Sequence, residues 1–152
     1  MKERYPQAVL KGKDLFCSSL FRDPTSTSVF YTFIAQLKRS IDRAQPSPTH
    51  LFLRTLDEKK RLLRSYTQNI DGFEEQIGLT GSGSERARIK GKGKAKLSVK
   101  EVRNVQLHGD IHRVRCGLCS CNLPCTEEYL SIFDSGYAPD CPECAQRCEF
   151  SY

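Results

Sequence analysis

The sequence predicts an α/β fold in which helices lie beside a parallel sheet, followed by a small module built around four cysteines. Two stretches of helical periodicity precede a short apolar strand, and a second short strand follows further along the chain. Seven of the eight cysteines lie between Cys116 and Cys148. The length of 152 residues suits about one ordinary domain of ~100–150 residues and excludes two large ones.

Two helices are expected before the first strand. In the first, one face carries apolar residues at helical spacing, namely Phe30, Phe33, Ile34, Leu37 and Ile41. This helix is expected to begin near Asp23-Pro24, where caps are available, and to end before Pro46. The second is expected to begin at Ser47-Pro48. Its apolar side is formed by Leu51, Phe52, Leu53 and Leu56.

Two short strands are expected after these helices. The first covers residues 62–67 and stops at the turn Asn69-Ile70-Asp71-Gly72, where Asp-Gly is a strong turn signal. The second covers residues 102–107 and ends at His108-Gly109. Because ligands of open α/β sheets bind beyond the carboxyl ends of the strands, the polar residues after both strands are candidates for a binding site.

A basic segment rich in glycine and serine, residues 80–100, separates the two strands. It carries seven Lys/Arg and one acid, so it alone accounts for the net charge of +6. We expect a flexible, solvated insertion. The alternative that such a run leaves open is a weak nucleic-acid contact through residues 86–100, or a nuclear import signal. No membrane span and no secretory signal are visible, so an intracellular protein without a membrane partner is expected.

The cysteine spacing predicts a zinc site. Two CxxC pairs are formed by Cys116, Cys119, Cys141 and Cys144. Each pair can fold into a tight turn that aims two thiolates at one point. Four thiolates suit tetrahedral zinc in a closed site, whose role is to hold a small module together.

The remaining cysteines leave alternatives open. Cys121, Cys125 and Cys148 permit other ligand sets within the module, residues 116–148. Cys17 stands alone between Phe16 and Leu20, and we expect it to be a buried thiol.

Three motifs in order along the chain resemble the sirtuin family of NAD-dependent protein-lysine deacylases. They are YTQNIDG at residues 66–72, LHG at residues 107–109, and the two CxxC pairs. The stretch Ser47-Pro48-Thr49-His50-Leu51 resembles the family's helix before the first of these motifs. Residues 14–16 and 20–24 look most like its fungal nuclear histone-deacetylase branch. The resemblance covers about residues 13–148. It implies a partial Rossmann-like sheet with a zinc ribbon, and zinc and NAD as cofactors. It also implies an acetylated lysine protein, such as a histone, as substrate and a nuclear location.

The resemblance also implies roles for single residues. His108 would be the general base that takes a proton from a ribose hydroxyl, because an imidazole titrates close to neutral pH. Asn69 would position ribose and water, Asp71 would hold the nicotinamide carboxamide, and Gln68 the adjacent ribose. Ile70 lies within the same cofactor-binding run. Taken singly, His108 would more often be a structural histidine, and the Asn and Asp would more often cap a turn.

The sequence also departs from the family pattern. No glycine-rich phosphate-binding turn precedes Lys13, and the family's later strands are not found before Tyr152. We therefore expect residues 13–152 to be a partial catalytic domain, truncated at both ends, inactive alone and marginally folded outside the zinc module. The alternative function is a non-enzymatic zinc-ribbon interaction module with a basic chromatin-binding arm; a DNA-binding zinc finger is disfavoured because no recognition helix is evident.

Overall fold

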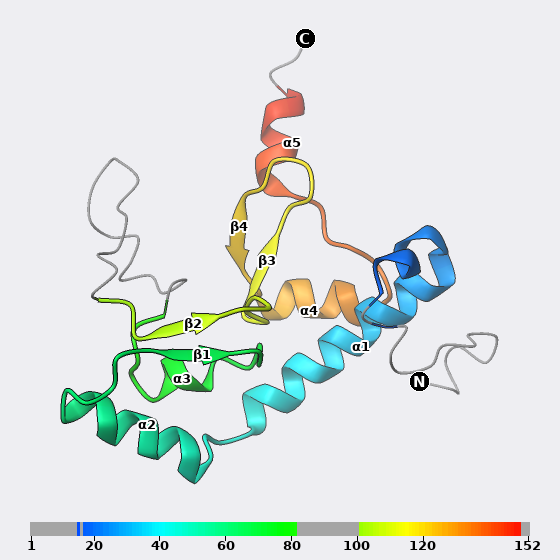
Figure 1. Ribbon diagram of the computed structural model, residues 1–152. Coiled ribbons are helices and arrows are strands. Elements are labelled where there is room, and N and C mark those ends of the chain that lie inside the picture. Colours follow the sequence, from blue (N-terminus) through cyan, green and yellow to red (C-terminus); the bar gives the residue numbers. More distant parts are fainter. Residues whose placement is uncertain (1–14, 16, 82–100, 150–152) are drawn as a thin grey trace. The chain divides into compact units, whose positions relative to one another are not determined.

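The computed structural model describes residue 15, residues 17–81 and residues 101–149 (Figure 1). The chain divides into two compact units, which are described separately. The first unit is Met1–Asp42 with Arg113–Tyr152, and the second is Arg43–His112. The mixture of helices with a small parallel sheet confirms the predicted α/β class. The segment 82–100, most of the predicted basic insertion, lies outside the described residues.

The first unit is a helical core with a small antiparallel hairpin. After a 3-10 helix at Ser18–Arg22 come α1 (Pro24–Arg43), β3 (Arg113–Arg115), β4 (Asn122–Pro124), α4 (Glu127–Asp134) and α5 (Pro142–Glu149). The predicted start of α1 is confirmed, because the Asp23 carboxylate accepts a hydrogen bond of 2.7 Å from the Ser26 amide. Its core is formed by Ala35, Leu130 and Phe133.

The second unit contains the parallel strands. Its elements are α2 (Pro48–Glu58), β1 (Ser65–Thr67), α3 (Phe73–Gln76) and β2 (Asn104–Gln106). β1 and β2 pair in parallel, with Ser65 opposite Asn104 and Thr67 opposite Gln106, and Figure 1 shows them side by side. A core of Leu62, Ile77 and Leu79 is packed by Leu53 and Leu56 of α2.

Several details differ from the sequence predictions. Both strands are shorter than expected, since regular pairing begins at Ser65 opposite Asn104 and ends at Thr67 opposite Gln106. Leu62 is buried in the core and Leu63 is 89% exposed, and both precede the paired strand. Only half of the predicted apolar side of α2 is used, since Leu51 and Phe52 are exposed.

The prediction that Cys17 is buried is wrong. Cys17 is exposed and lies at the start of the 3-10 helix, where its sulfur is 3.0 Å from the Ser19 hydroxyl. Leu20 takes the buried position instead, with 6% of its surface exposed. Among the described residues, no helix has both the length and the apolar character that a membrane crossing would require.

Candidate functional site

The polar residues after the two parallel strands lie at the same edge of the sheet. The Thr67–Gln106 pair ends the ladder, and the Leu107 amide donates to the Thr67 carbonyl at 2.9 Å. Both strands therefore end at the same edge of the sheet. Gln68 and Asn69 follow the end of β1, and His108 follows the end of β2. All three side chains are exposed to solvent.

The loop after β1 is held in place by two of its own side chains and by the loop after β2. The Asn69 amide donates to the Thr67 hydroxyl at 3.1 Å, and the Phe73 amide donates to Asp71 Oδ1 at 3.3 Å. The Ile111 amide donates to the Ile70 carbonyl at 3.0 Å. The loop then turns at Gly72, whose φ of 72° lies in the left-handed region that favours glycine.

His112 contacts this loop as well, although the sequence analysis did not single it out. Its Nε2 lies 2.9 Å from the Asp71 carbonyl oxygen, and its own amide donates to Asp110 Oδ1 at 2.9 Å. A carbonyl can only accept, so Nε2 carries the proton in this contact. The signal in the sequence was weak: an Asp two residues before a His can form an Asx turn that presents the ring.

A second group that the sequence reasoning missed surrounds Asp71. One ring nitrogen of His50 and one carboxylate oxygen each of Asp71 and Glu74 lie within 4.8 Å of one another. Glu74 is 4% exposed, and its Oε2 has no hydrogen-bond partner among the residues that the structure describes.

The donor set of this group does not fit a metal ion. The Ser47 amide donates to His50 Nδ1 at 3.0 Å, so the neutral ring carries its proton on Nε2. Neither nitrogen then has a free lone pair for a cation. His50 closes the capping box at the start of α2, which gives this ring a structural role.

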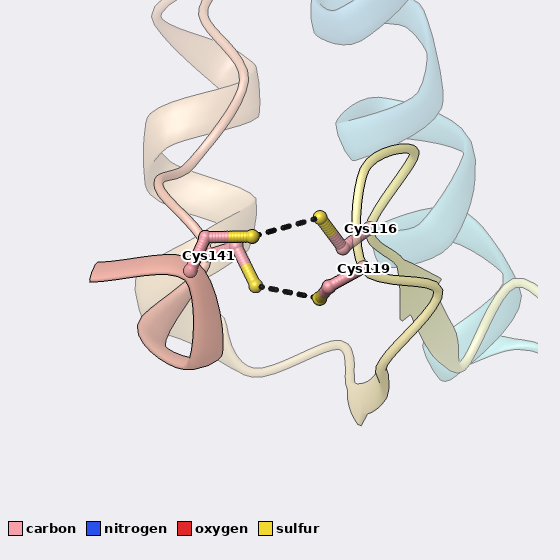
Figure 2. A group of neighbouring side chains, drawn as sticks. Cys116, Cys119 and Cys141 are labelled. Atoms are coloured by element: carbon pink, nitrogen blue, oxygen red, sulfur yellow. Dashed lines mark hydrogen bonds between the residues drawn. The ribbon is translucent and has the colours of Figure 1, made fainter. Parts of the chain in front are cut away.

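The four predicted zinc ligands converge in the first unit. One sulfur from each of Cys116, Cys119, Cys141 and Cys144 lies within 4.8 Å of the others. The Cys116–Cys144 sulfurs are 3.8 Å apart and the Cys119–Cys141 sulfurs 3.6 Å apart; dashed lines join these two pairs in Figure 2. Zinc–sulfur bonds of ~2.3 Å place tetrahedral sulfurs roughly 3.8 Å apart. The cluster therefore has the dimensions of a zinc–tetrathiolate centre.

Local backbone structure aims these thiols. The Cys116 amide donates to the Cys121 carbonyl at 2.9 Å, and the Ser120 amide donates to the Cys116 carbonyl at 3.0 Å, which closes a tight turn after β3. Ser120 adopts a φ of 61° in that turn. On the other side, Cys141 precedes α5 and Cys144 lies in its first turn.

The surplus cysteines separate into different environments. Cys125 packs against the core of Ala35, Leu130 and Phe133. The Cys121 sulfur is 3.3 Å from that of Cys141, so it lies beside the cluster. The side chain of Cys148 lies outside the described residues.

Hydrogen bonds divide the negative charge of the metal-free cluster unevenly. The Cys144 amide, which donates to the Cys141 sulfur, lowers the pKa of Cys141 to about 6. The amides of Cys119 and Leu118 lower the pKa of Cys116. Hydrogen bonding to Cys141 raises the pKa of Cys121 to about 12, and hydrogen bonding to Cys119 raises the pKa of Cys144 to about 12. A bound zinc ion would deprotonate its four ligands outright.

Comparison with known proteins shows the family. The profile described as "Sir2 family" matches residues 4–87, which is more than half of the chain and includes the loop at residues 68–71. The chain belongs to the Sir2 family.

Individual relatives extend the Sir2 match over nearly the whole chain. The NAD-dependent histone deacetylase HST3 of Candida albicans is 39% identical over 97% of this chain, and that of Saccharomyces cerevisiae is 36% identical over 90%. The NAD-dependent protein deacetylase hst4 of Schizosaccharomyces pombe is 32% identical over 91%. The chain spans 30% of the length of each of these three relatives. The predicted likeness to fungal histone deacetylases is confirmed.

Proposed function

We propose that this protein is an NAD-dependent protein-lysine deacetylase in which His108 is the general base. The observation that carries this proposal is the parallel pairing of β1 with β2, which brings His108 to the same sheet edge as Asn69 and Asp71. The relatives named above are NAD-dependent deacetylases, and two of them are named as histone deacetylases. We therefore propose acetylated histone lysine as the substrate and the nucleus as the location.

The side chains would divide the work as follows. The exposed imidazole of His108 would accept the proton of a ribose hydroxyl of NAD, which is a poor nucleophile until it is deprotonated. Asn69 would use its amide to orient ribose and water, and Gln68 would bind the neighbouring ribose hydroxyl. The Asp71 carboxylate would accept from the nicotinamide carboxamide, while Ile70 would contribute apolar contact beside it.

The zinc centre would have a structural role. Cys116, Cys119, Cys141 and Cys144 would hold the ion, which would join the turn after β3 to the start of α5. A closed tetrathiolate site offers no position for substrate. Its contribution would be to fold the module, since a small metal site couples binding to folding.

A chimera tests this function directly. The chain replaces its aligned stretch in the Candida albicans relative, and deacetylation of an acetylated histone peptide is measured with and without NAD. We expect NAD-dependent turnover, and we expect His108→Ala to lower kcat by roughly 10²- to 10⁴-fold, the range of general-base catalysis. Gln76→Ala, an exposed substitution at the end of α3, is the matched control and should change kcat by less than about twofold.

One outcome would contradict the proposal. A folded chimera that binds one zinc per chain but turns over no faster than its His108→Ala variant would remove His108 from the chemistry. It would instead favour the zinc-ribbon interaction module as the function of this chain.

A further inference from the structure

We propose that His112 is a positioning residue that holds the backbone of Asp71 in the orientation needed to bind nicotinamide. This inference rests on the proposed function, in which the Asp71 carboxylate accepts a hydrogen bond from the nicotinamide carboxamide. The juxtaposition that points to it joins residues 41 positions apart, because His112 Nε2 donates to the Asp71 carbonyl at 2.9 Å. His112 touches no reacting atom in this scheme. It acts through the backbone of Asp71.

Both peptide planes that flank Asp71 are held by the loop after β2. The plane before it is held through the Ile70 carbonyl, which accepts from the Ile111 amide at 3.0 Å. The plane after it is held through the Asp71 carbonyl, which accepts from His112. With both planes fixed, φ and ψ of Asp71 have little freedom, so the direction of its Cα–Cβ bond is fixed.

Within the described part of the chain, the Asp71 carboxylate itself is tied on one side only. Its Oδ1 accepts from the Phe73 amide at 3.3 Å, a long hydrogen bond that leaves much of its accepting capacity unused. A loose carboxylate on a moving loop would lose affinity for a carboxamide, because ordering it would cost free energy at each binding event. We call the hydrogen bonds from Ile111 to Ile70 and from His112 to Asp71 the backbone clamp. The clamp orders the loop before the ligand arrives, so this part of the ordering cost does not reduce the affinity.

The surroundings of His112 are shaped for this contact. Asp110 Oδ1 accepts from the His112 amide at 2.9 Å, which sets the direction of the ring. The ring lies against Gly72, where an added Cβ would be 2.9 Å from Cδ2 and 3.1 Å from Nε2. Gly72 therefore has two reasons to lack a side chain: its left-handed backbone and the approach of this ring.

Two variants of the full zinc-loaded chain separate hydrogen bonding from packing. His112→Gln keeps an N–H donor at a similar reach, whereas His112→Leu keeps bulk and removes the donor. The probe is nicotinamide, titrated while the backbone amides are followed by NMR, and the exchange rate of the Ile111 amide is measured without ligand. The chain contains three histidines, so the Nε2 proton of His112 can be assigned in the spectrum.

We expect His112→Leu to bind nicotinamide roughly three- to tenfold more weakly and to exchange the Ile111 amide faster by a similar factor, the effect of one lost hydrogen bond. His112→Gln should stay within about twofold of the parent chain on both readouts. Unchanged exchange at Leu79, in the core of the same unit as His112, together with unchanged zinc content in the other unit, would show that the fold is intact. These results together would support the clamp.

Other outcomes overturn one claim or the other. If His112→Leu bound nicotinamide and exchanged the Ile111 amide like the parent chain, the clamp would be overturned. The clamp would also be overturned if His112→Gln bound nicotinamide as weakly as His112→Leu. If nicotinamide bound neither the parent nor the variants, the nicotinamide assignment in the proposed function would fail. The exchange rate of the Ile111 amide would then decide the clamp alone: faster exchange in the Leu variant supports it, and equal rates refute it.

Discussion

Replacing Gly72 with alanine should be unusually costly for so small a change. The substitution places a Cβ on a residue with a φ of 72°, and left-handed backbone costs a residue with a side chain roughly 1–2 kcal/mol. The new Cβ also meets the His112 ring at 2.9 Å. The cheapest relief is for the ring to move, which breaks its bond to the Asp71 carbonyl and costs a further ~0.5–1.5 kcal/mol. We therefore expect a total loss of about 1.5–3.5 kcal/mol of local stability.

Two controls separate these contributions. Gly78 has a φ of 99° and nothing within 4 Å of its hypothetical Cβ, so Gly78→Ala should show the backbone cost alone, roughly 1–2 kcal/mol. The second control is the double variant Gly72→Ala with His112→Ala. Once the ring is gone, the added methyl group has space, so the cost of Gly72→Ala should fall by about 1 kcal/mol in that background.

Native-state hydrogen exchange is the appropriate assay, because the two compact units need not unfold in a single step. The amides of Ile77 and Leu79, bonded to the carbonyls of Phe73 and Glu74 at 3.0 Å each, report on the second unit. An equal cost of Gly72→Ala with and without His112, within about 0.3 kcal/mol, would refute the reasoning. The reasoning would also be refuted if Gly72→Ala lost no more stability than Gly78→Ala.

Two further predictions concern the cysteine cluster. Cys116→Ser and Cys141→Ser should each lower bound zinc well below one ion per chain, whereas Cys125→Ser should retain it because Cys125 packs in the core; elemental analysis of the purified variants would measure this, and full zinc retention by Cys141→Ser would remove it from the ligand set. In the metal-free chain, the pKa of about 6 at Cys141 predicts alkylation by iodoacetamide that is nearly constant above about pH 7 and falls as the pH drops through about 6. Cys121, with a pKa of about 12, should still react faster with each step up to about pH 9, as read by peptide mass spectrometry. The same lowered pKa means that the Cys141 thiolate favours the folded state above the ordinary thiol pKa, and that this contribution is lost as the pH falls through about 6. A Cys141 rate that still rises steeply above about pH 8 would contradict this assignment.

Local patterns in the sequence predicted the features that are determined locally. The periodicity from Phe30 to Ile41 and the Asp23-Pro24 start predicted α1, because a helix is specified by its own face and cap. The two CxxC pairs predicted the sulfur cluster for the same reason, since each pair folds as a local turn. The strand ends were less predictable. Leu62 and Leu63 are the same residue type, yet Leu62 is buried and Leu63 is exposed. Pairing begins at Ser65 because that is where β2 lies alongside the chain.

Contacts between distant residues could not be predicted from one sequence. His112 and Asp71 meet across 41 positions, and Glu74 was overlooked because its burial depends on how α3 packs. The prediction that Cys17 is buried was wrong for a related reason. Its apolar neighbours suggested burial, but the start of a 3-10 helix exposes that position and buries Leu20 instead. In each case the sequence states the residue type, while the tertiary fold decides its environment.

The site depends on hydrogen bonds that continue the β1–β2 ladder beyond the strands. Each strand is three residues long, which would hold two loops poorly if pairing ended there. Pairing instead continues through Leu107 to Thr67, then Ile111 to Ile70, and then through the His112 side chain to Asp71. The first two bonds use backbone amides and tolerate most substitutions, whereas the third needs a side chain that can donate an N–H at this reach and a glycine beside it. Variation at the exposed positions of this edge should therefore change what the site binds, while a side chain at Gly72 or the loss of the N–H donor at His112 should change whether the site is formed.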